Sequence, residues 1–303
     1  MPLYDENERL KKQTRVLTDL NYIIMNNSIY PCLTIRGKIA EAADFYLDTF
    51  GDGQINSSNP IVITLTLSGQ LFMLLGDGPT STPNPSISFM VLSEDEKETE
   101  AYYNKLIDGG STLMPLDKYP WSPKYAWVQD KFGVSWQLYT GAKNDTNQKF
   151  CPTLMFTGDK AGKAEEAVHF YTGLFHDSEL QGILKYSEGE DNTNYVKHSQ
   201  FKIKQFVTMA MDSSADHGFG FVDAISLVVN CRDQAEIDRY WDGLIAGGGR
   251  EVACGWLVDK YGVSWQIVPD KLGKWMSDPE KFQRVLNALM KMKKLIYSEL
   301  ENA

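Results

Sequence analysis

The sequence lacks two features that many nucleic-acid-binding and membrane proteins have, an excess of basic residues and a long apolar run. Its 303 residues include 30 Lys and Arg against 40 Asp and Glu, which gives a net charge of -10 at pH 7. Phosphate backbones and anionic lipid surfaces are bound by clustered positive charge, so we expect neither nucleic acid nor a membrane as a partner. No stretch is continuously apolar over the ~20 residues that span a bilayer, and the polar first residues do not resemble an export signal. The sequence therefore predicts a soluble cytoplasmic protein.

The sequence also has few residues that commonly bind metals. Its four cysteines stand alone, without a C-x-x-C pair, and its four histidines show neither H-x-H nor H-E-x-x-H spacing. His198 lies on a predicted strand and could turn inward, but we expect a packing or surface role for it, as for the others. Isolated cysteines are typical of a reducing compartment. We expect no metal and no other cofactor.

What the sequence does contain is a long internal repeat. DKFGVSWQ at residues 130–137 recurs as DKYGVSWQ at residues 259–266. One set of helix positions is repeated in the second half: Ile39, Ala43, Tyr46 and Phe50 correspond to Ala164, Val168, Tyr171 and Phe175. A repeat of this length indicates duplicated domains and excludes a short-period solenoid. Within the octapeptides, Asp-Lys-aromatic-Gly suits a hairpin loop and the Trp suits the core.

Strand-like and helix-like segments alternate in the order βαβββ, twice in each half. The predicted fold class is therefore α+β, with four βαβββ modules in two tandem domains and helices at both ends. We expect an N-terminal helical extension at 1–28, domains at 29–141 and 150–272, a polar linker at 142–149, and a C-terminal amphipathic helix at 273–303. In that last helix the residues that share one side are Phe282, Val285, Leu286, Leu289 and Ile296. This helix is expected to pack on a domain or on a partner chain in a homo-oligomer.

Several segments of the second half resemble one known family. AISLVV, DRYWDGLIAGGG, CGWLVDKYGVSWQIVP and WMSDPEK are similar to the PhnB-like family named 3-demethylubiquinone-9 3-methyltransferase, over about residues 150–303. The first half, with FYLDTFG, SISFMV and VQDKFGVSWQ, resembles a more divergent member, in which Tyr125-Ala126-Trp127 replaces CGW. The family resembles the glyoxalase, bleomycin-resistance and extradiol dioxygenase (vicinal oxygen chelate) superfamily. This resemblance implies two βαβββ units around a shared cleft, so that each half would form one complete cleft-bearing domain.

Strand alternation predicts which side chains face such a cleft, because successive residues of a strand point to opposite faces. The predicted cleft residues on the first and last strands are Cys32, Thr34, Thr153, Ser135, Gln137, Tyr139, Ser264 and Gln266. Trp127 and Trp256 lie one strand away and offer a stacking surface, with core packing as the alternative. Cys254 precedes the last hairpin, and it is either a cleft residue or a small buried one.

The resemblance also implies where a metal would bind. Metal-using members of the superfamily place His or Glu on the first, fourth, fifth and eighth strands. Here Gln137 and Gln266 stand where the eighth strand would supply a glutamate, and a carboxamide binds transition metals far more weakly than a carboxylate does. The family name suggests methyl transfer, which usually needs a glycine-rich turn between a strand and a helix. The Gly-Asp-Gly at 51–53 follows a helix instead, and the glycines at 247–249 end one.

These observations favour metal-independent binding of a small molecule in a polar and aromatic cleft. One alternative is a metal-dependent lyase or dioxygenase, or a methyltransferase as the family name suggests. Another is a structural protein whose terminal helices hold an oligomer and whose clefts are vestigial.

Overall fold

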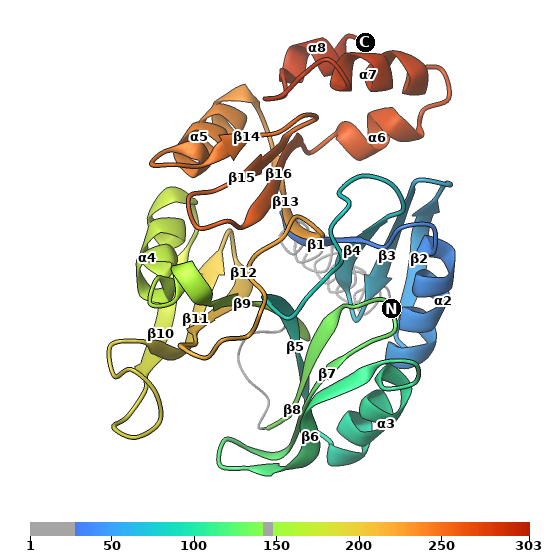
Figure 1. Cartoon of the computed structure of the whole chain (residues 1–303). Coiled ribbons are helices and arrows are strands. Elements are labelled where there is room, and N and C mark those ends of the chain that lie inside the picture. The colour runs from blue at the N-terminus through green and yellow to red at the C-terminus, as the bar shows by residue number, and fades with distance from the viewer. Residues whose placement is uncertain (1–27, 142–147) are drawn as a thin grey trace, which may run out of the picture.

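The computed structural model describes residues 28–141 and 148–303, and it confirms the α+β fold class (Figure 1). The first module contains β1 (Ile29–Thr34), α2 (Ile39–Phe50), β2 (Gly53–Ser58), β3 (Val62–Leu67) and β4 (Gln70–Leu75). The second contains β5 (Ile87–Ser93), α3 (Glu96–Leu106), β6 (Ser111–Tyr119), β7 (Ser122–Gln129) and β8 (Ser135–Thr140). The expected N-terminal helix lies outside the described residues.

The second half repeats this order. The third module contains β9 (Phe150–Phe156), a 3-10 turn (Gly158–Lys160), α4 (Ala164–Leu174), β10 (Glu179–Lys185), β11 (Val196–Ile203) and β12 (Phe206–Asp212). The fourth contains β13 (Ile225–Cys231), α5 (Gln234–Ile245), β14 (Arg250–Glu251), β15 (Trp256–Val258) and β16 (Ser264–Pro269). A C-terminal segment follows, with α6 (Leu272–Ser277), α7 (Phe282–Leu289) and α8 (Tyr297–Glu301).

The modules combine into two eight-stranded sheets in an order that the repeat did not predict. Sheet A has the strand order β14-β15-β16-β13-β1-β4-β3-β2, so it joins the first module to the fourth. Sheet B has the order β10-β11-β12-β9-β5-β8-β7-β6 and joins the second module to the third. In sheet A the two halves of the chain meet at the antiparallel pair β1 and β13, where Cys32 lies opposite Ser226. In sheet B they meet at the antiparallel pair β5 and β9, where Ser88 lies opposite Thr153. The expectation that each half forms one complete cleft-bearing domain is therefore wrong, because both sheets cross between the halves.

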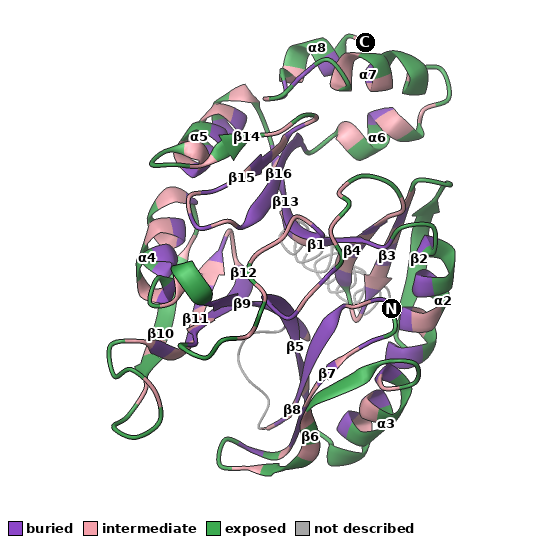
Figure 2. Cartoon of the chain, in the orientation of Figure 1, coloured by how far each residue is buried: buried purple, intermediate pink, exposed green. Residues whose placement is uncertain are grey.

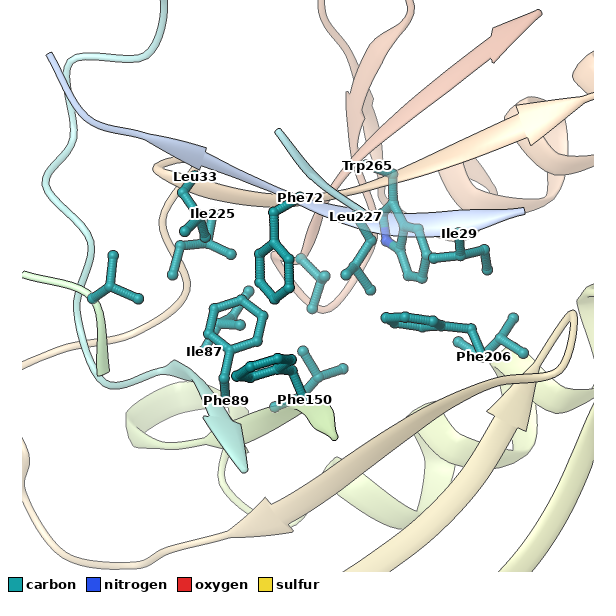
Figure 3. Packing of buried hydrophobic residues seen from close by; sticks show 14 of the residues in the cluster. Ile29, Leu33, Phe72, Ile87, Phe89, Phe150, Phe206, Ile225, Leu227 and Trp265 are labelled. Carbon is teal, nitrogen blue, oxygen red and sulfur yellow. The ribbon is translucent and has the colours of Figure 1, made fainter. Parts of the chain in front are cut away.

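One continuous apolar core lies between the two sheets. In Figure 3, Leu33, Phe72, Leu227 and Trp265 of sheet A point toward Phe89, Phe150 and Phe206 of sheet B. The helices α2 to α5 turn their buried sides into this same core, as the purple bands in Figure 2 show. Each sheet therefore has one face in the core and one face that points away from it. We call the faces that point away face A and face B.

Single residues determine where the helices α2 and α5 begin or end. α2 ends at Gly51, whose φ of 73° places it in the left-handed region that glycine adopts at low cost. α5 begins after Asp233, whose carboxylate accepts the Glu236 N–H at 2.9 Å. Gly247, with a φ of 74°, follows the end of α5. The glycines at 51 and 247 thus end helices, as the sequence indicated.

Each half contains one buried aspartate that ties its two modules together through the core. Asp130 accepts hydrogen bonds from the Tyr46 hydroxyl at 2.9 Å and from the Trp136 indole N–H at 2.8 Å. Asp259 accepts the equivalent bonds from the tyrosine of α4 at 2.7 Å and the tryptophan of β16 at 2.9 Å. Both also accept N–H groups of their own hairpin loops, which agrees with the predicted turn. Burial raises the pKa of Asp130 to about 6, although these donors lower it.

The C-terminal segment packs on face A, and it is not the single amphipathic helix that the sequence predicted. Its buried side chains are Trp275, Val285, Met292, Leu295 and Leu300, which form one cluster with Cys32, Val228 and Val268 of face A. α7 ends after Leu289, and the chain then passes beside the loop before β15, where Met292 and Lys293 accept backbone hydrogen bonds. Figure 1 shows α6 to α8 beyond β15 and β16. Among the described helices, none has the length and hydrophobicity needed to cross a bilayer.

Candidate functional site

The predicted cleft residues lie on the two faces that point away from the core, but they group across the halves. Face A carries Cys32, Thr34, Trp256, Ser264 and Gln266. Face B carries Thr153, Trp127, Ser135, Gln137 and Tyr139. The alternation that assigned these side chains to one face of each strand therefore agrees with the strand register. Cys254 lies in the loop before β15, at the margin of face A.

The centre of face B is a chain of neutral hydrogen-bonding groups around Gln137. The Gln137 amide donates to Ser88 Oγ at 2.8 Å, and its oxygen accepts the Tyr125 hydroxyl at 2.9 Å. All three residues are buried. Because the amide is held at both ends, its orientation is fixed, and within the described residues one of its N–H groups remains unused. Tyr125, which the sequence reasoning missed, lies two residues before Trp127 on β7, so alternation alone could have found it.

Methionines and aromatic rings surround this polar chain. Trp127 donates its indole N–H to Ser135 Oγ at 2.6 Å, which fixes the ring against β8. The apolar cluster on face B consists of residues from its own strands: Met90, Leu92, Met114, Tyr119, Tyr125, Trp127, Tyr139, Cys151, Val207 and Met209. Methionine is flexible and polarisable, and it packs favourably against aromatic rings. On face B, therefore, adaptable apolar side chains, half of them buried, surround a rigid polar centre.

His198 belongs to face B, although a packing or surface role was expected for it. It lies on β11 two residues before Gln200, which is opposite Met209, so it shares the face of that methionine. It is half-buried, and burial lowers its pKa below the usual value. At neutral pH the imidazole is therefore uncharged and can donate or accept one hydrogen bond.

Face A repeats the polar centre with one change. Gln266 donates to Ser226 Oγ at 3.0 Å, as Gln137 does to Ser88. The position of Tyr125 in the repeat is taken by Cys254, so the tyrosine bond to the amide oxygen has no counterpart there. Burial raises the pKa of Cys32 to about 12, so this thiol is neutral and is not a nucleophile.

The tryptophan of face A is arranged differently from that of face B. Trp256 packs in the cluster that contains the C-terminal segment. Ser264, the counterpart of Ser135, is fully buried, and its hydroxyl has no hydrogen-bond partner in the described part of the chain. The Thr34 hydroxyl on the same face is also buried and unpaired there. On face A, therefore, two hydroxyls are buried and unpaired within the described residues, while the Trp256 ring packs with the C-terminal segment.

Cys254 is held in an unusual backbone conformation. Its φ is 59°, in the left-handed region, and its Sγ lies 3.7 Å from the sulfur of Met290. Burial raises the pKa of its thiol. No base or cation that would activate it contacts the thiol among the described residues. The geometry favours the structural alternative for Cys254 over a nucleophile.

The residues that stand where the resemblance would place a metal do not fit a transition metal. On face B the four strand positions supply Thr153, Met209, Ser88 and Gln137, and both ends of that amide are already engaged. Hydroxyl, thioether and amide groups carry no charge and are weak ligands for divalent metals. In the ranges 28–141 and 148–303, no group of three or more His, Cys, Asp or Glu side chains is placed to hold a metal ion.

The residues between β1 and α2 also do not fit the methyl donor that the family name implies. Its nucleoside would need a glycine-rich turn between a strand and a helix, whereas β1 and α2 are joined through one glycine, Gly37. A cavity of about 520 Å³ does lie at this end of α2, between Lys38, Glu41 and Asn59. None of the residues that line it belongs to the Gln137 chain, and in the described residues no buried unpaired side chain is among them.

The two serines beside the tryptophans allow a matched test of this geometry. We expect Ser135→Ala to lower the free energy of unfolding by about 1 to 2 kcal/mol, because the Trp127 N–H loses its acceptor. Ser264→Ala should change it by less than about 0.5 kcal/mol or increase it, because a buried hydroxyl without a partner is removed. Urea denaturation of both variants measures the difference. An equal loss in the two variants would contradict the different environments of the two serines.

Comparison with known proteins agrees with this fold. The model of the family described as 3-demethylubiquinone-9 3-methyltransferase matches residues 27–139 and again 148–268. The PhnB protein from Bacillus cereus is 36% identical over 36% of this chain and 96% of its own, with a TM-score of 0.35. Glyoxalase I from Zea mays is 13% identical and covers 80% of this chain and 92% of its own, with a TM-score of 0.55, a likeness of fold alone. No curated protein matches the sequence.

Proposed function

The chain belongs to the 3-demethylubiquinone-9 3-methyltransferase family and contains two copies of the family domain. From this starting point, we propose that the protein binds a small molecule on face B without a metal. The observation that carries this proposal is the hydrogen-bonded chain of Tyr125, Gln137 and Ser88 in the middle of an apolar and aromatic surface. Ligand sites are typically apolar surfaces with a few polar groups held in fixed orientations.

The chemistry of face B selects a neutral, largely apolar ligand. Its central groups are an amide, hydroxyls and an uncharged imidazole, so an ionised ligand would lose hydration without finding an opposite charge. Trp127 and Tyr139 provide rings for stacking, and Met90 and Met209 can adjust to the outline of the ligand. The unused N–H of Gln137 can donate to one carbonyl or ether oxygen.

The test is a thermal-shift screen of metabolites and antibiotics, followed by binding measurements on two variants. A ligand at a hundredfold excess over its Kd should stabilise the protein by about 2.7 kcal/mol. We expect Gln137→Ala to weaken binding about 10-fold, since one hydrogen bond and the orientation of the Tyr125 hydroxyl are lost. Gln266→Ala, the matched change on face A, should leave the affinity unchanged.

Three outcomes would count against the proposal. Equal affinity in Gln137→Ala and the wild type would remove face B as the site. Stoichiometric metal that survives chelation would favour the metal-dependent lyase, dioxygenase or methyltransferase. The absence of any hit would favour a structural role, for which the exposed Phe282, Met290 and Ile296 of the C-terminal segment would supply an oligomer contact.

We also propose that the protein works in a reducing compartment such as the cytoplasm. All four cysteines are free thiols, and three of them, Cys32, Cys151 and Cys231, are buried in the folded chain. Intracellular proteins typically keep their cysteines reduced in this way.

A further inference from the structure

The C-terminal segment, residues 272–303, packs on face A, where two buried hydroxyls have no partner among the described residues. We propose that this segment is a displaceable cover, which competes with neutral apolar small molecules for face A. Face A would then be a second binding surface that is closed by the chain itself. The inference concerns face A alone and does not depend on ligand binding at face B.

The cover is attached mainly by side chains. Its helices have six, eight and five residues, and isolated helices shorter than about 12 residues are marginal in water, so their stability comes from packing on face A. Two backbone bonds link it to the loop before β15, from Cys254 N to Met292 O and from Gly255 N to Lys293 O, each 2.8 Å. The side-chain amide of Gln234 adds two more bonds, because it donates to Leu295 O and accepts the backbone N–H of Tyr297.

The ion pairs around the cover contribute little to its attachment. Lys294 reaches Asp238 and Asp242 at 3.1 and 2.7 Å, and these partners are 48% and 64% exposed. Exposed pairs of this kind are weak and are screened by salt. The apolar contacts of Leu295 and its neighbours in the cluster therefore provide most of the adhesion.

The closed state carries three unfavourable features. The hydroxyls of Ser264 and Thr34 are buried without partners in the described structure. Cys254, a residue with a Cβ, has a φ of 59° in a turn that is closed by the bond from Trp256 N to Ala253 O at 3.1 Å. Buried polar groups without partners and left-handed residues both raise the free energy of a state. The Ser264 hydroxyl is the group that departure of the cover would relieve, because the neighbouring Trp256 packs with the cover.

Face B shows the alternative arrangement of the same tryptophan and serine. There Trp127 donates to Ser135, whereas the equivalent Trp256 packs with the cover and Ser264 is unpaired. Departure of the cover would free the Trp256 ring to turn and donate to Ser264. When the cover leaves, Trp256 would thus lose its apolar contact with the cover and gain a hydrogen bond to Ser264.

Gly255 explains how the cover approaches so closely. Its φ is 84°, and a Cβ there would lie 3.0 Å from Leu295 Cδ1 and 2.9 Å from Ile267 O. The positive φ and the Ile267 oxygen require a glycine at this position, and the lack of a Cβ also leaves room for Leu295 beside the loop. Leu295 is fully buried, whereas its neighbour Ile296 is exposed, so the two residues form a matched pair for mutation.

Hydrogen exchange measures the opening directly, because the amides of Cys254 and Gly255 are bonded to the cover. In the wild type we expect these two amides to exchange at least about 100-fold faster than those of β13. Leu295→Asp should accelerate them at least a further 100-fold and leave β13 unchanged, since a buried leucine is replaced by a charge. The control Ile296→Asp should have little effect.

Two further measurements separate the steps of the proposal. Ser264→Ala should slow exchange at Cys254 and Gly255 about 5-fold, because the open state loses its hydrogen bond to Trp256. Saturating N-phenyl-1-naphthylamine, a neutral apolar fluorescent probe, should accelerate the two amides at least about 10-fold, and it should do so in Gln137→Ala as well.

The proposal is overturned if Cys254 and Gly255 exchange at the same rate as β13 in the wild type, because the cover would then be a fixed part of the core. No effect of Ser264→Ala contradicts the exchange of partners. Failure of the probe to bind, or binding that leaves both amides unchanged, contradicts competition for face A.

Discussion

Asp259→Ala is expected to lower the free energy of unfolding by about 4 kcal/mol, the largest effect of any substitution considered for this protein. The carboxylate accepts the Tyr171 hydroxyl, the Trp265 indole N–H and the backbone N–H groups of Tyr261 and Val263, at 2.7 to 3.0 Å. Alanine leaves all of these donors buried without an acceptor. Denaturation in urea at neutral pH measures the loss.

Two neighbouring variants provide controls for this prediction. Tyr171→Phe removes one donor and should cost about 1 to 2 kcal/mol, which remains measurable if Asp259→Ala does not fold. Lys260→Ala changes the next residue, whose ammonium pairs with Glu166 at the surface, and should have little effect. If Asp259→Ala lowers the free energy of unfolding no more than Lys260→Ala does, the aspartate contributes only to the hairpin loop and not to the contact between modules.

Lys204→Met is expected to cost about 3 kcal/mol, because it leaves the carboxylate of Glu236 buried with much less compensation. Lys204 lies in the β11–β12 turn of sheet B, and its Nζ is 3.2 Å from Glu236 Oε1 on α5, which packs on sheet A. The two side chains are only 11% and 7% exposed. This ion pair therefore joins the two sheets where water is largely excluded.

The effect of Lys204→Met should depend on pH. Burial raises the pKa of Glu236, but the Arg232 N–H and the Lys204 ammonium outweigh it and hold the pKa below the usual 4.5. A lowered pKa means that the stabilisation is present above pH 4.5 and is lost as the pH falls through the folded value. The difference between wild type and variant should therefore shrink in acid. Lys271→Met, which breaks the exposed pair with Glu301, should change little at any pH.

The repeat and strand alternation predicted much of the fold and the facing of the candidate site. Ser135, Gln137 and Tyr139 were assigned to one face of β8, and the register agrees, because alternation depends only on backbone geometry. The role of these residues in binding stays a prediction. β2 could not be found by the same means, since all six of its residues are exposed and no apolar alternation exists there.

The pairing of modules could not be predicted because alternation says which face a side chain takes but not which strand lies beside it. Nothing local in β1 marks β13 as its partner. The C-terminal segment was misread for a similar reason. Its apolar periodicity suits one helix, but Met292 and Lys293 instead turn their carbonyls to the amides of Cys254 and Gly255, which lie far away in sequence.

The pairing of the first module with the fourth has a consequence for how the chain is made. Sheet B is built from two modules that follow each other in sequence, so its strands can associate as soon as β12 leaves the ribosome. β1 must wait for β13, which begins only at Ile225. Contacts between distant segments form slowly because a long loop has to close first. Sheet B is therefore expected to form early in synthesis, while the free edge of β1 stays exposed to aggregation or to chaperones until β13 has been made.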